Sequence, residues 1–464
     1  MALLSALPFL FAVHPQQADY PSHLARYHVM MERAGSPFLS QYYDFQWAWT
    51  GNLGVDMLMW PLGALLGVER AAWLIALLLP VLTGLAILSV EWVLRRRIGA
   101  GSFLALALVW SPAMLMGFSN FSLALVLALF AFAAWVKLEG RGWRAALFVP
   151  VGLAVFLCHS AGWGVLGVLL FGYEWHRRKS VASLLAPWPL FLPFAAIVLQ
   201  PGVGSSLDYG TGVGAYKFAI WLKALADRWP ALDMLSVLAL LGVIGIALQR
   251  RWIDGRLGWA ALIVGVLTLV MPRHFGGGDF ADLRLVPVAL MLGCMAIDAK
   301  LPRWVLWLAP ALFLLRLGVT SLGWQEDSQR LERDLAALEF MPEGARVAGA
   351  SAYFTGRWGP DSTEHAPSYA TVHRDALVNT HFSLPGVHML SVKGAGPEFA
   401  DPSQRVAVLP GEAVDLSSHP PAAQADYLWY FGANPVAKLP DGAEVLYRSP
   451  TSLLARLAKR PPAR

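Results

Sequence analysis

Long apolar segments alternate with short clusters of lysine and arginine along most of this chain, and this alternation limits the folds open to it. Only 14% of the 464 residues are charged and 56% are hydrophobic, whereas soluble globular proteins carry about 25% charged residues. Apolar segments of this length and frequency are expected to cross a bilayer as helices. The sequence therefore predicts an integral membrane protein.

Eleven apolar segments are expected to span the membrane. The first, residues 1–13, is short, and it lacks the basic start and the small-residue cleavage site of a signal peptide. The others are residues 71–94, 101–116, 119–136, 145–158, 161–175, 181–199, 231–248, 257–271, 285–298 and 303–321. A further segment, 53–67, is interrupted by glycine and proline and is expected beside the membrane.

Five basic clusters recur at every second connection between these segments, as cytoplasmic loops do. They are Arg95 to Arg97; Lys137, Arg141 and Arg144; Arg177 to Lys179; Arg250, Arg251 and Arg256; and Lys300 with Arg303. They account for most of the net charge of +5 without any nucleic-acid partner. Placing them in the cytoplasm puts the N-terminus inside and the C-terminus outside a bacterial inner (plasma) membrane.

This topology gathers unusual polar residues on the extracytoplasmic side. The first extracytoplasmic loop, residues 16–68, contains Asp19, His23 and Arg26, and Pro21 fits the first turn of a helix there. We expect that helix to lie on the membrane plane. Its apolar residues at helical spacing are Leu24, Tyr27 and Met31.

The composition changes after Ser321, where half of the Asp, Glu and His residues follow in less than a third of the chain. Residues 322–464 are enough for one soluble domain, expected to be α/β or α+β and extracytoplasmic. The predicted fold class is therefore an α-helical polytopic membrane domain, residues 1–321, followed by a soluble α/β domain.

Asp19 is the candidate general base. A carboxylate at the membrane interface beside His23 can take a proton from an acceptor hydroxyl, and Arg26 follows three residues later on the same helix face. A structural alternative is an acid that stabilises the helix dipole, with His23 and Arg26 as ordinary interfacial residues. The spacing does not decide between the two.

A second group of candidates lies in a glycine-rich loop between two expected spans and consists of Arg273, His274, Asp282 and Arg284. Arg284 enters the head of the next helix, where a guanidinium is usually paired or functional. A phosphate at head-group level is a natural partner for it. The alternative is an ion pair between Arg284 and Asp282 or Asp279 that only anchors the loop.

Two further residues could bind a substrate. His159 lies at a hairpin between apolar segments and Asn120 follows a turn, but an interfacial histidine and a turn signal explain them as well. In the C-terminal region, four histidines recur without the spacing of a metal motif; they are His365, His373, His381 and His388. No metal site is predicted, and the cofactor stays open, including a divalent metal.

The order of these features resembles the GT-C superfamily of polytopic glycosyltransferases, which take sugars from polyprenyl-phosphate donors at the outer face of the membrane. A first span is followed at once by the acidic loop Ala18-Asp19-Tyr-Pro-Ser-His23-Leu-Ala-Arg26. Juxtamembrane helices, many spans and a C-terminal soluble domain come next. Many members carry two adjacent acidic residues in that loop, whereas Asp19 lies between Ala18 and Tyr20.

The resemblance implies that Asp19 is the catalytic base and that a basic residue, which we assign by location to Arg284, lies near the donor phosphate. The expected reaction transfers a hexose or pentose, with inversion, from a lipid-linked donor to an envelope glycan, lipid or protein. The expected substrate-binding residues are His23, Arg26, Asn120, His159, Arg273, His274, Asp282 and Arg284.

Two other functions fit a chain of this class. A transporter or flippase for a lipid-linked glycan would distribute polar residues through its spans, whereas here they gather at one face, which favours the enzyme. A scaffold whose outer domain binds envelope partners would not need so many spans.

Overall fold

The structure is a computed structural model that describes residues 1–193, 207–275, 278–299, 303–354, 356–384, 388–399 and 404–458, without the side chains of 303–305. The chain forms two compact units. Unit 1 contains Met1–Leu10, Trp49–Met57 and Ile75–Gly323, and unit 2 contains Phe11–Ala48, Leu58–Leu74 and Trp324–Arg464. Most of the predicted first loop thus belongs to the same compact unit as the C-terminal region; the functional division at residue 321 stays a prediction.

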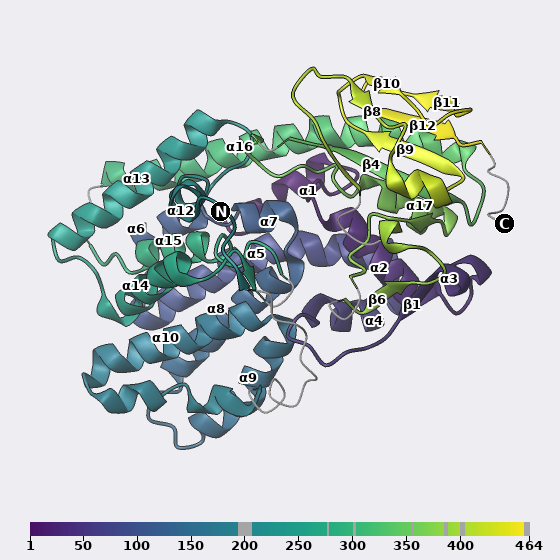
Figure 1. Cartoon of the computed structure of the whole chain (residues 1–464). Coiled ribbons are helices and arrows are strands. Elements are labelled where there is room, and N and C mark those ends of the chain that lie inside the picture. Colours follow the sequence, from purple (N-terminus) through teal and green to yellow (C-terminus); the bar gives the residue numbers. More distant parts are fainter. Residues whose placement is uncertain are drawn as a thin grey trace. The chain divides into compact units, whose positions relative to one another are not determined.

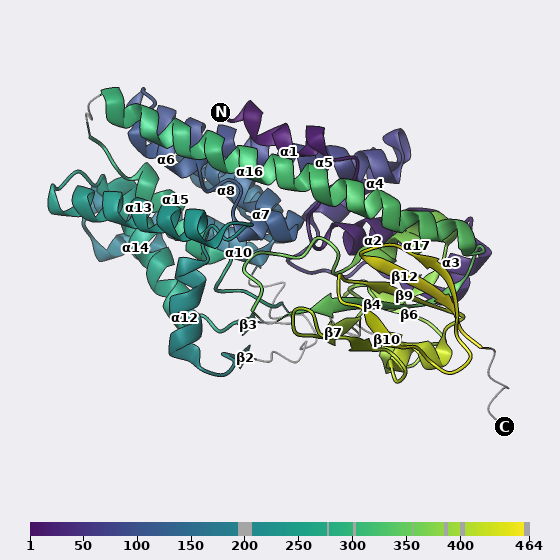
Figure 2. The same ribbon diagram turned by 90° about the horizontal axis from the view of Figure 1, so that it is seen from above.

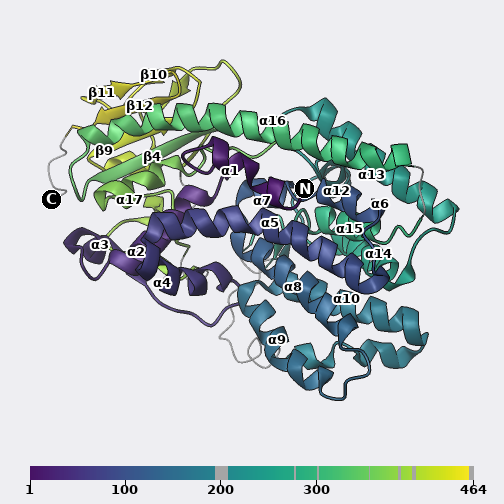
Figure 3. The ribbon, with the colours of Figure 1, turned by 180° about the vertical axis from the view of Figure 1, so that it is seen from behind.

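Unit 1 is built from helices, several of which lie side by side (Figure 3). Four helices cross the boundary between the units in sequence: α1 (Leu7–Phe11), α4 (Gly54–Leu66), α5 (Val68–Arg95) and α16 (Arg303–Leu335). The other α-helices of unit 1 are α6 (Ala100–Leu106), α7 (Pro112–Met116), α8 (Ser119–Lys137), α9 (Arg144–Cys158), α10 (Ser160–Arg178), α12 (Val213–Leu222), α13 (Pro230–Gln249), α14 (Gly255–Val270) and α15 (Leu285–Met295).

Four helices among the described residues are long and apolar enough to cross a membrane: Val68–Arg95, Ser119–Lys137, Pro230–Gln249 and Leu306–Phe340. Shorter apolar helices occupy most of the other expected spans. The number of spans, predicted as eleven, therefore stays a prediction, while the polytopic helical character agrees with these four helices.

Several expected spans differ from the helices observed. Residues 101–116 are not one helix: α6 ends at Leu106, turns follow, and α7 begins at Pro112. Proline fits the first turn of α7 and disfavours a helical conformation of Ser111 before it. At the N-terminus, α1 covers only Leu7–Phe11. The span expected at 303–321 continues to Leu335 as one helix (Figure 2). Of the span at 181–199, residues 194–199 lie outside the described residues.

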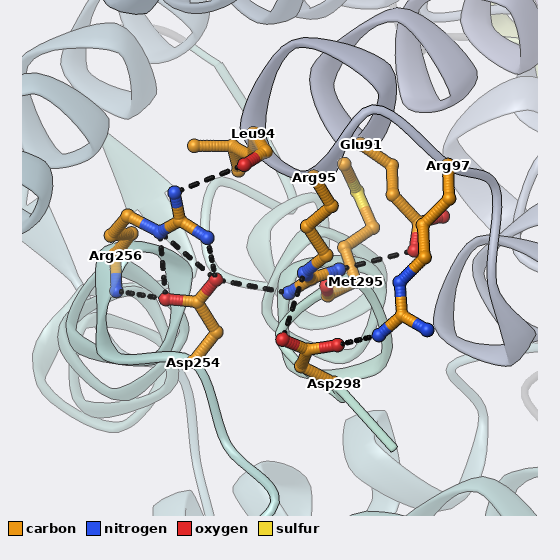
Figure 4. Close-up of polar contacts among 8 residues, drawn as sticks. All are labelled: Glu91, Leu94, Arg95, Arg97, Asp254, Arg256, Met295 and Asp298. Atoms are coloured by element: carbon orange, nitrogen blue, oxygen red, sulfur yellow. Dashed lines mark hydrogen bonds and ion pairs between the residues drawn. The ribbon is translucent and has the colours of Figure 1, made fainter. Parts of the chain in front are cut away.

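One end of unit 1 is closed by a network of ion pairs (Figure 4). Its members are Glu91, Arg95, Arg97, Asp254, Arg256 and Asp298. The Arg95 side chain is 3% exposed and lies within 3.8 Å of both Asp254 and Asp298. A buried guanidinium needs opposite charge close by, so members of two predicted basic clusters meet around shared carboxylates.

A second network joins two more clusters. Glu174 on α10 is fully buried and pairs with Arg144, Arg177 and Arg178 at 2.9–3.0 Å. Two residues after Glu174, His176 lies against Gly255. A Cβ added to Gly255 would be 2.3 Å from Nδ1 of His176. Because Gly255 begins α14 beside Asp254, the two networks lie at the same end of unit 1.

Members of four of the five predicted basic clusters therefore share one end of unit 1. The polar residues at the starts of two helices lie at the opposite end: α10 begins after His159 and α15 begins after Arg284. Lys300 of the fifth cluster lies outside the described residues. Which end faces the cytoplasm stays a prediction.

Unit 2 combines short helices with a mixed sheet (Figure 1). Its first-loop elements are α2 (Tyr20–Glu32), α3 (Pro37–Tyr42) and β1 (Tyr43–Phe45). Its C-terminal elements are β4 (Arg346–Tyr353), η5 (Ala366–Ser368), α17 (Tyr369–Arg374), β5 (Leu377–Val378), β6 (Leu390–Val392), β7 (Arg405–Ala407), β8 (Val414–Asp415), β9 (Tyr427–Phe431), β10 (Val436–Lys438), β11 (Glu444–Arg448) and β12 (Ser452–Arg456).

The main sheet has the strand order β11-β12-β9-β4-β5, with β7 also paired to β4. Strand β4 is parallel to β5, β7 and β9, and β12 is antiparallel to β9 and β11. Both β4 and β9 are largely buried, and their apolar residues form a core with those of β12. Parallel and antiparallel pairs in one sheet fit the expected mixed α and β character.

The first loop is built into unit 2. Strand β1 pairs antiparallel with β6, and a core cluster joins the two segments through Val29, Leu39, Tyr43, Leu377, Leu390 and Phe399. Helix α2 forms as predicted, but eight of its 13 residues are buried and it packs on α17. Leu24 and Tyr27, two of the apolar residues expected to face the membrane, are buried inside the protein instead, and the position of α2 relative to the membrane stays a prediction.

Gly349 in β4 is a point of close approach between the sheet and the segments around it. A Cβ at this position would lie 2.7 Å from Pro367 Cβ and 2.8 Å from Thr380 Cγ2. The Asn379 side chain accepts from Gly349 N (2.6 Å) and donates to Gly349 O (3.0 Å). The absence of a side chain therefore lets the chain after β5 pack directly on β4.

We expect Gly349→Ala to destabilise unit 2 by about 1–3 kcal/mol, the usual cost of overpacking a filled core. Thermal unfolding of the purified protein in detergent measures the change. Gly35→Ala is the matched control, since its Cβ would come no closer than 3.7 Å to Glu32 O. Equal unfolding temperatures for the two variants would contradict this account of Gly349.

Candidate active site

Asp19 lies at the N-terminus of α2, and its carboxylate makes no capping hydrogen bond to that helix. Its side chain is 16% exposed, and Oδ1 lies 3.9 Å from Nε2 of His365. This distance is too long for a direct hydrogen bond but short enough for an ion pair when the imidazole is protonated. The carboxylate predicted from the sequence is thus held beside an imidazole.

The position of His365 is set from the sheet outward. Its ring is 1% exposed, and its Nδ1 lies 2.6 Å from the carbonyl oxygen of Thr380. Thr380 follows Asn379, which is bonded to Gly349 of β4. Ser351, also on β4, donates to the Glu364 carbonyl at 2.8 Å, so both sides of the imidazole are anchored to the same strand.

An aromatic ring connects His365 with the rest of the first-loop motif. The Phe382 ring centroid is 4.8 Å from that of His365, 5.3 Å from that of His23 and 5.7 Å from that of His388. Burial, with the added positive charge of Arg26, lowers the pKa of His388 to about 4. We call these six residues the Asp19 cluster: Asp19, His23, Arg26, His365, Phe382 and His388.

The Asp19 cluster contains all three first-loop residues singled out in the sequence. Two of its histidines were considered there only as metal ligands, and Phe382 was not considered. A short motif cannot show which distant histidine it meets, and the recurrence of histidines about every eight residues was the one available signal. No group of three or more His, Cys, Asp or Glu within the described residues could hold a metal ion.

Arg284 and His159 are in contact in unit 1. The local sequence around either residue does not predict this contact. Nη1 of Arg284 lies 3.0 Å from Nε2 of His159, and its Nη2 donates to the Asp279 carbonyl at 3.0 Å. The guanidinium carbon lies 3.9 Å from the Phe118 ring centroid. Since His159 Nδ1 accepts from Ala161 N at 3.1 Å, the helix α10 fixes the orientation of the imidazole.

The carboxylates near Arg284 are held by other cations. Asp279 accepts two hydrogen bonds from Arg273, at 2.9 and 3.0 Å, and His274 lies 3.4 Å from it. Asp282 is fully buried and pairs with Lys217 of α12 at 2.5 Å. These contacts anchor the loop, and a substrate role for Arg273, His274 and Asp282 stays a prediction.

Asn120 joins α8 to the segment that precedes α4. Its Oδ1 accepts from Val55 N at 2.6 Å, and its Nδ2 donates to Asn52 O at 2.9 Å. Both ends of the amide therefore hold protein groups, and a substrate contact for Asn120 also stays a prediction.

The described residues line two cavities, one in each unit. In unit 1, a cavity of about 20 Å³, the size of a water molecule, is lined by Arg284, Phe121 and the hydroxyls of Thr83, Ser111 and Ser122. In unit 2, an open cavity of about 600 Å³ is lined by polar residues that include His28, Glu32, Glu69 and Asp375. None of the site residues predicted from the sequence lines the second cavity.

No protein-family model and no curated protein matches this chain. Two solved structures are similar: ArnT from Cupriavidus metallidurans bound to undecaprenyl phosphate (12% identity, TM-score 0.46) and ArnT from the same organism in the apo state (13%, TM-score 0.47). Each similarity covers 98% of this chain and 96% of that one. At this identity and these TM-scores, no family, activity or residue role passes to this chain.

A buried polar network behind the Asp19 cluster makes unit 2 sensitive to pH. His381 Nε2 lies 3.1 Å from the Tyr43 hydroxyl and 2.9 Å from the Thr371 hydroxyl, all fully buried. Burial, with a smaller contribution from His365, lowers the pKa of His381 from 6.5 to about 3. Between these values the unfolded chain binds a proton that the folded chain does not, so stability falls as the pH falls.

We expect the unfolding temperature of the protein to drop between pH 7 and pH 5, with His381 contributing roughly 2 kcal/mol of the loss. His381→Gln keeps an amide for the two hydroxyls but cannot titrate in this range, so its unfolding temperature should depend less on pH. Thermal unfolding at both pH values in one detergent measures this. Parallel curves for wild type and variant would show that another group causes the dependence.

Proposed function

We propose that this protein is a membrane glycosyltransferase that transfers a sugar from a polyprenyl-phosphate-linked donor to a cell-envelope acceptor at the extracytoplasmic face. The observation that carries the proposal is the Asp19 carboxylate, placed at the head of α2 beside a buried imidazole. A shielded carboxylate next to a proton-accepting ring is suited to general base catalysis. The type of reaction, transfer of a sugar from a lipid-linked donor, is proposed from the resemblance of the first loop to the GT-C superfamily.

In the proposed reaction, Asp19 takes the proton of an acceptor hydroxyl as that oxygen attacks the anomeric carbon. The bond between sugar and phosphate breaks from the opposite side, which inverts the configuration. His23 and Arg26 are proposed to contact the substrate from the same helix. Arg26 is only 4% exposed, so it would act through its charge and its fixed position.

Arg284 is proposed to bind the phosphate of the lipid-linked donor. It lies at the end of unit 1 opposite the basic clusters, beside His159, whose second nitrogen already accepts from the helix backbone. A guanidinium suits phosphate oxygens because its N–H groups form a planar fork. If the basic clusters are cytoplasmic, as basic loops usually are, Arg284 lies at the extracytoplasmic head-group level.

Replacement of the base tests the reaction. With a panel of polyprenyl-phosphate sugars as donors and membrane extract as acceptor, we expect wild type to consume a donor. Asp19→Asn should be about 100- to 10,000-fold slower, the usual contribution of a general base. Donor consumption is followed directly, and thermal unfolding in detergent verifies that the variant is folded.

Asp44→Asn is the matched control. Asp44 is another first-loop aspartate, and its carboxylate is bound by Arg33 and Gln46. The Asp44→Asn variant should therefore retain turnover. Equal turnover by wild type and Asp19→Asn would place the base elsewhere, and a lack of turnover with every donor would favour binding or transport over catalysis.

Binding of the carrier lipid tests Arg284 separately. We expect Arg284→Gln to weaken the affinity of the protein for undecaprenyl phosphate in nanodiscs by about 10- to 100-fold, because a hydrogen bond to a charged group contributes about 1.5–3 kcal/mol. Arg284→Lys should lose less, since it keeps the charge without the planar fork. Arg330→Gln, an exposed residue of α16, serves as control. Unchanged affinity in Arg284→Gln would refute the phosphate role.

A further inference from the structure

His365 has a hydrogen-bonding geometry that defines which of its nitrogens can handle a proton. The carbonyl oxygen of Thr380 can only accept, so Nδ1, at 2.6 Å from it, carries the hydrogen of that bond. The atom that remains for proton exchange is Nε2. This is the atom that faces Asp19, with Oδ1 at 3.9 Å.

The separation of the two groups fits an oxygen between them. A hydroxyl oxygen at an ordinary hydrogen-bond distance of about 2.7 Å from both Asp19 Oδ1 and His365 Nε2 would subtend an angle of about 90°. A hydroxyl group could therefore contact both at once. A direct bond between Asp19 and His365 would need only a small approach of the carboxylate.

We propose that His365 is the positioning residue of Asp19 and the place where the proton removed from the acceptor goes next; this rests on the proposed function. The acceptor hydroxyl gives its proton to Asp19 while its oxygen bonds to the anomeric carbon and the donor phosphate leaves with the electron pair of the broken bond. The carboxyl proton then passes to the lone pair of His365 Nε2. The products are an imidazolium and a carboxylate, which stabilise each other.

The neighbours of His365 define the electrostatic setting of this transfer. Asp19 faces it from the head of α2, and His381 acts on it from the chain after β5. His23 and His388 face it across the Phe382 ring. Burial and, to a smaller extent, the positive charge of Arg26 lower the pKa of His388, which disfavours transfer of the proton to His388.

Two substitutions separate this role from a structural one. His365→Asn keeps an N–H that can reach the Thr380 carbonyl but has no atom in place of Nε2. His365→Gln carries an amide in the place of Nε2 but gives up the bond to Thr380. A purely structural His365 would be replaced best by asparagine, whereas a partner of Asp19 would be replaced better by glutamine.

The experiment compares turnover from pH 5 to pH 9 for wild type, His365→Asn, His365→Gln, Asp19→Asn and the double variant Asp19→Asn/His365→Asn. The donor is whichever polyprenyl-phosphate sugar the wild type consumes. We expect His365→Asn to unfold like wild type, to lose about 10- to 100-fold in turnover, as supporting groups of catalytic residues do, and to lose activity on the acid side at a higher pH. In the double variant, the second substitution should add nothing to Asp19→Asn.

The outcomes are distinguishable. A wild-type rate and pH profile in His365→Asn, or a full additional loss in the double variant, overturns the role of His365 and leaves the proposed function intact. Turnover by wild type that survives in Asp19→Asn overturns the base and this inference together. An absence of turnover with every donor overturns both the proposed function and the inference.

Discussion

A charge that leaves water must have an opposite charge or a hydrogen-bonding group close by, and this requirement organises unit 1. Arg95, Glu174, Asp282 and Asp233 are each almost fully buried, and each is within reach of a partner from another helix or loop. Removing one member of such a pair is costly, because the other is left charged in a medium of low dielectric. The pairs therefore fix which helix ends meet, since apolar helix faces alone pack in many ways.

The same requirement separates the two ends of unit 1. Basic residues that would repel one another are brought together around Asp254, Asp298 and Glu174. At that end of unit 1, the arginines of the two networks are paired with carboxylates of the same unit. At the opposite end the carboxylates of Asp279 and Asp282 are engaged by Arg273 and Lys217. Arg284 contacts the imidazole of His159, the backbone carbonyl of Asp279 and the aromatic ring of Phe118.

Unit 2 depends on a different interaction, the close packing of the Pro367 and Thr380 side chains on the backbone of Gly349. Because this residue has no side chain, the chain after β5 lies directly on β4, and the Asn379 amide locks the two together. The Thr380 carbonyl then points at His365 and sets its tautomer. Through this series of contacts, the geometry around Asp19 is determined by the centre of a sheet and not by the first loop alone.

The sequence by itself determined the class of protein, the helical nature of most apolar segments and the candidates Asp19 and Arg284. These follow from local properties: low charge, apolar length, helix-start residues and the cost of a guanidinium near a membrane. It also predicted α2, but not that the apolar face of α2 would pack on α17. It treated residues 101–116 as continuous, although Pro112 interrupts the helix.

Only the tertiary structure decided what the candidates touch. Asp19 lies beside His365, and Arg284 lies beside His159. The local sequence predicts neither contact, because each joins segments that are far apart in the chain. The first depends on a sheet formed from C-terminal strands, and the second on the packing of α10 against neighbouring helices. Periodicity and composition report which face of a segment is buried, whereas the identity of its partner is a property of the whole fold.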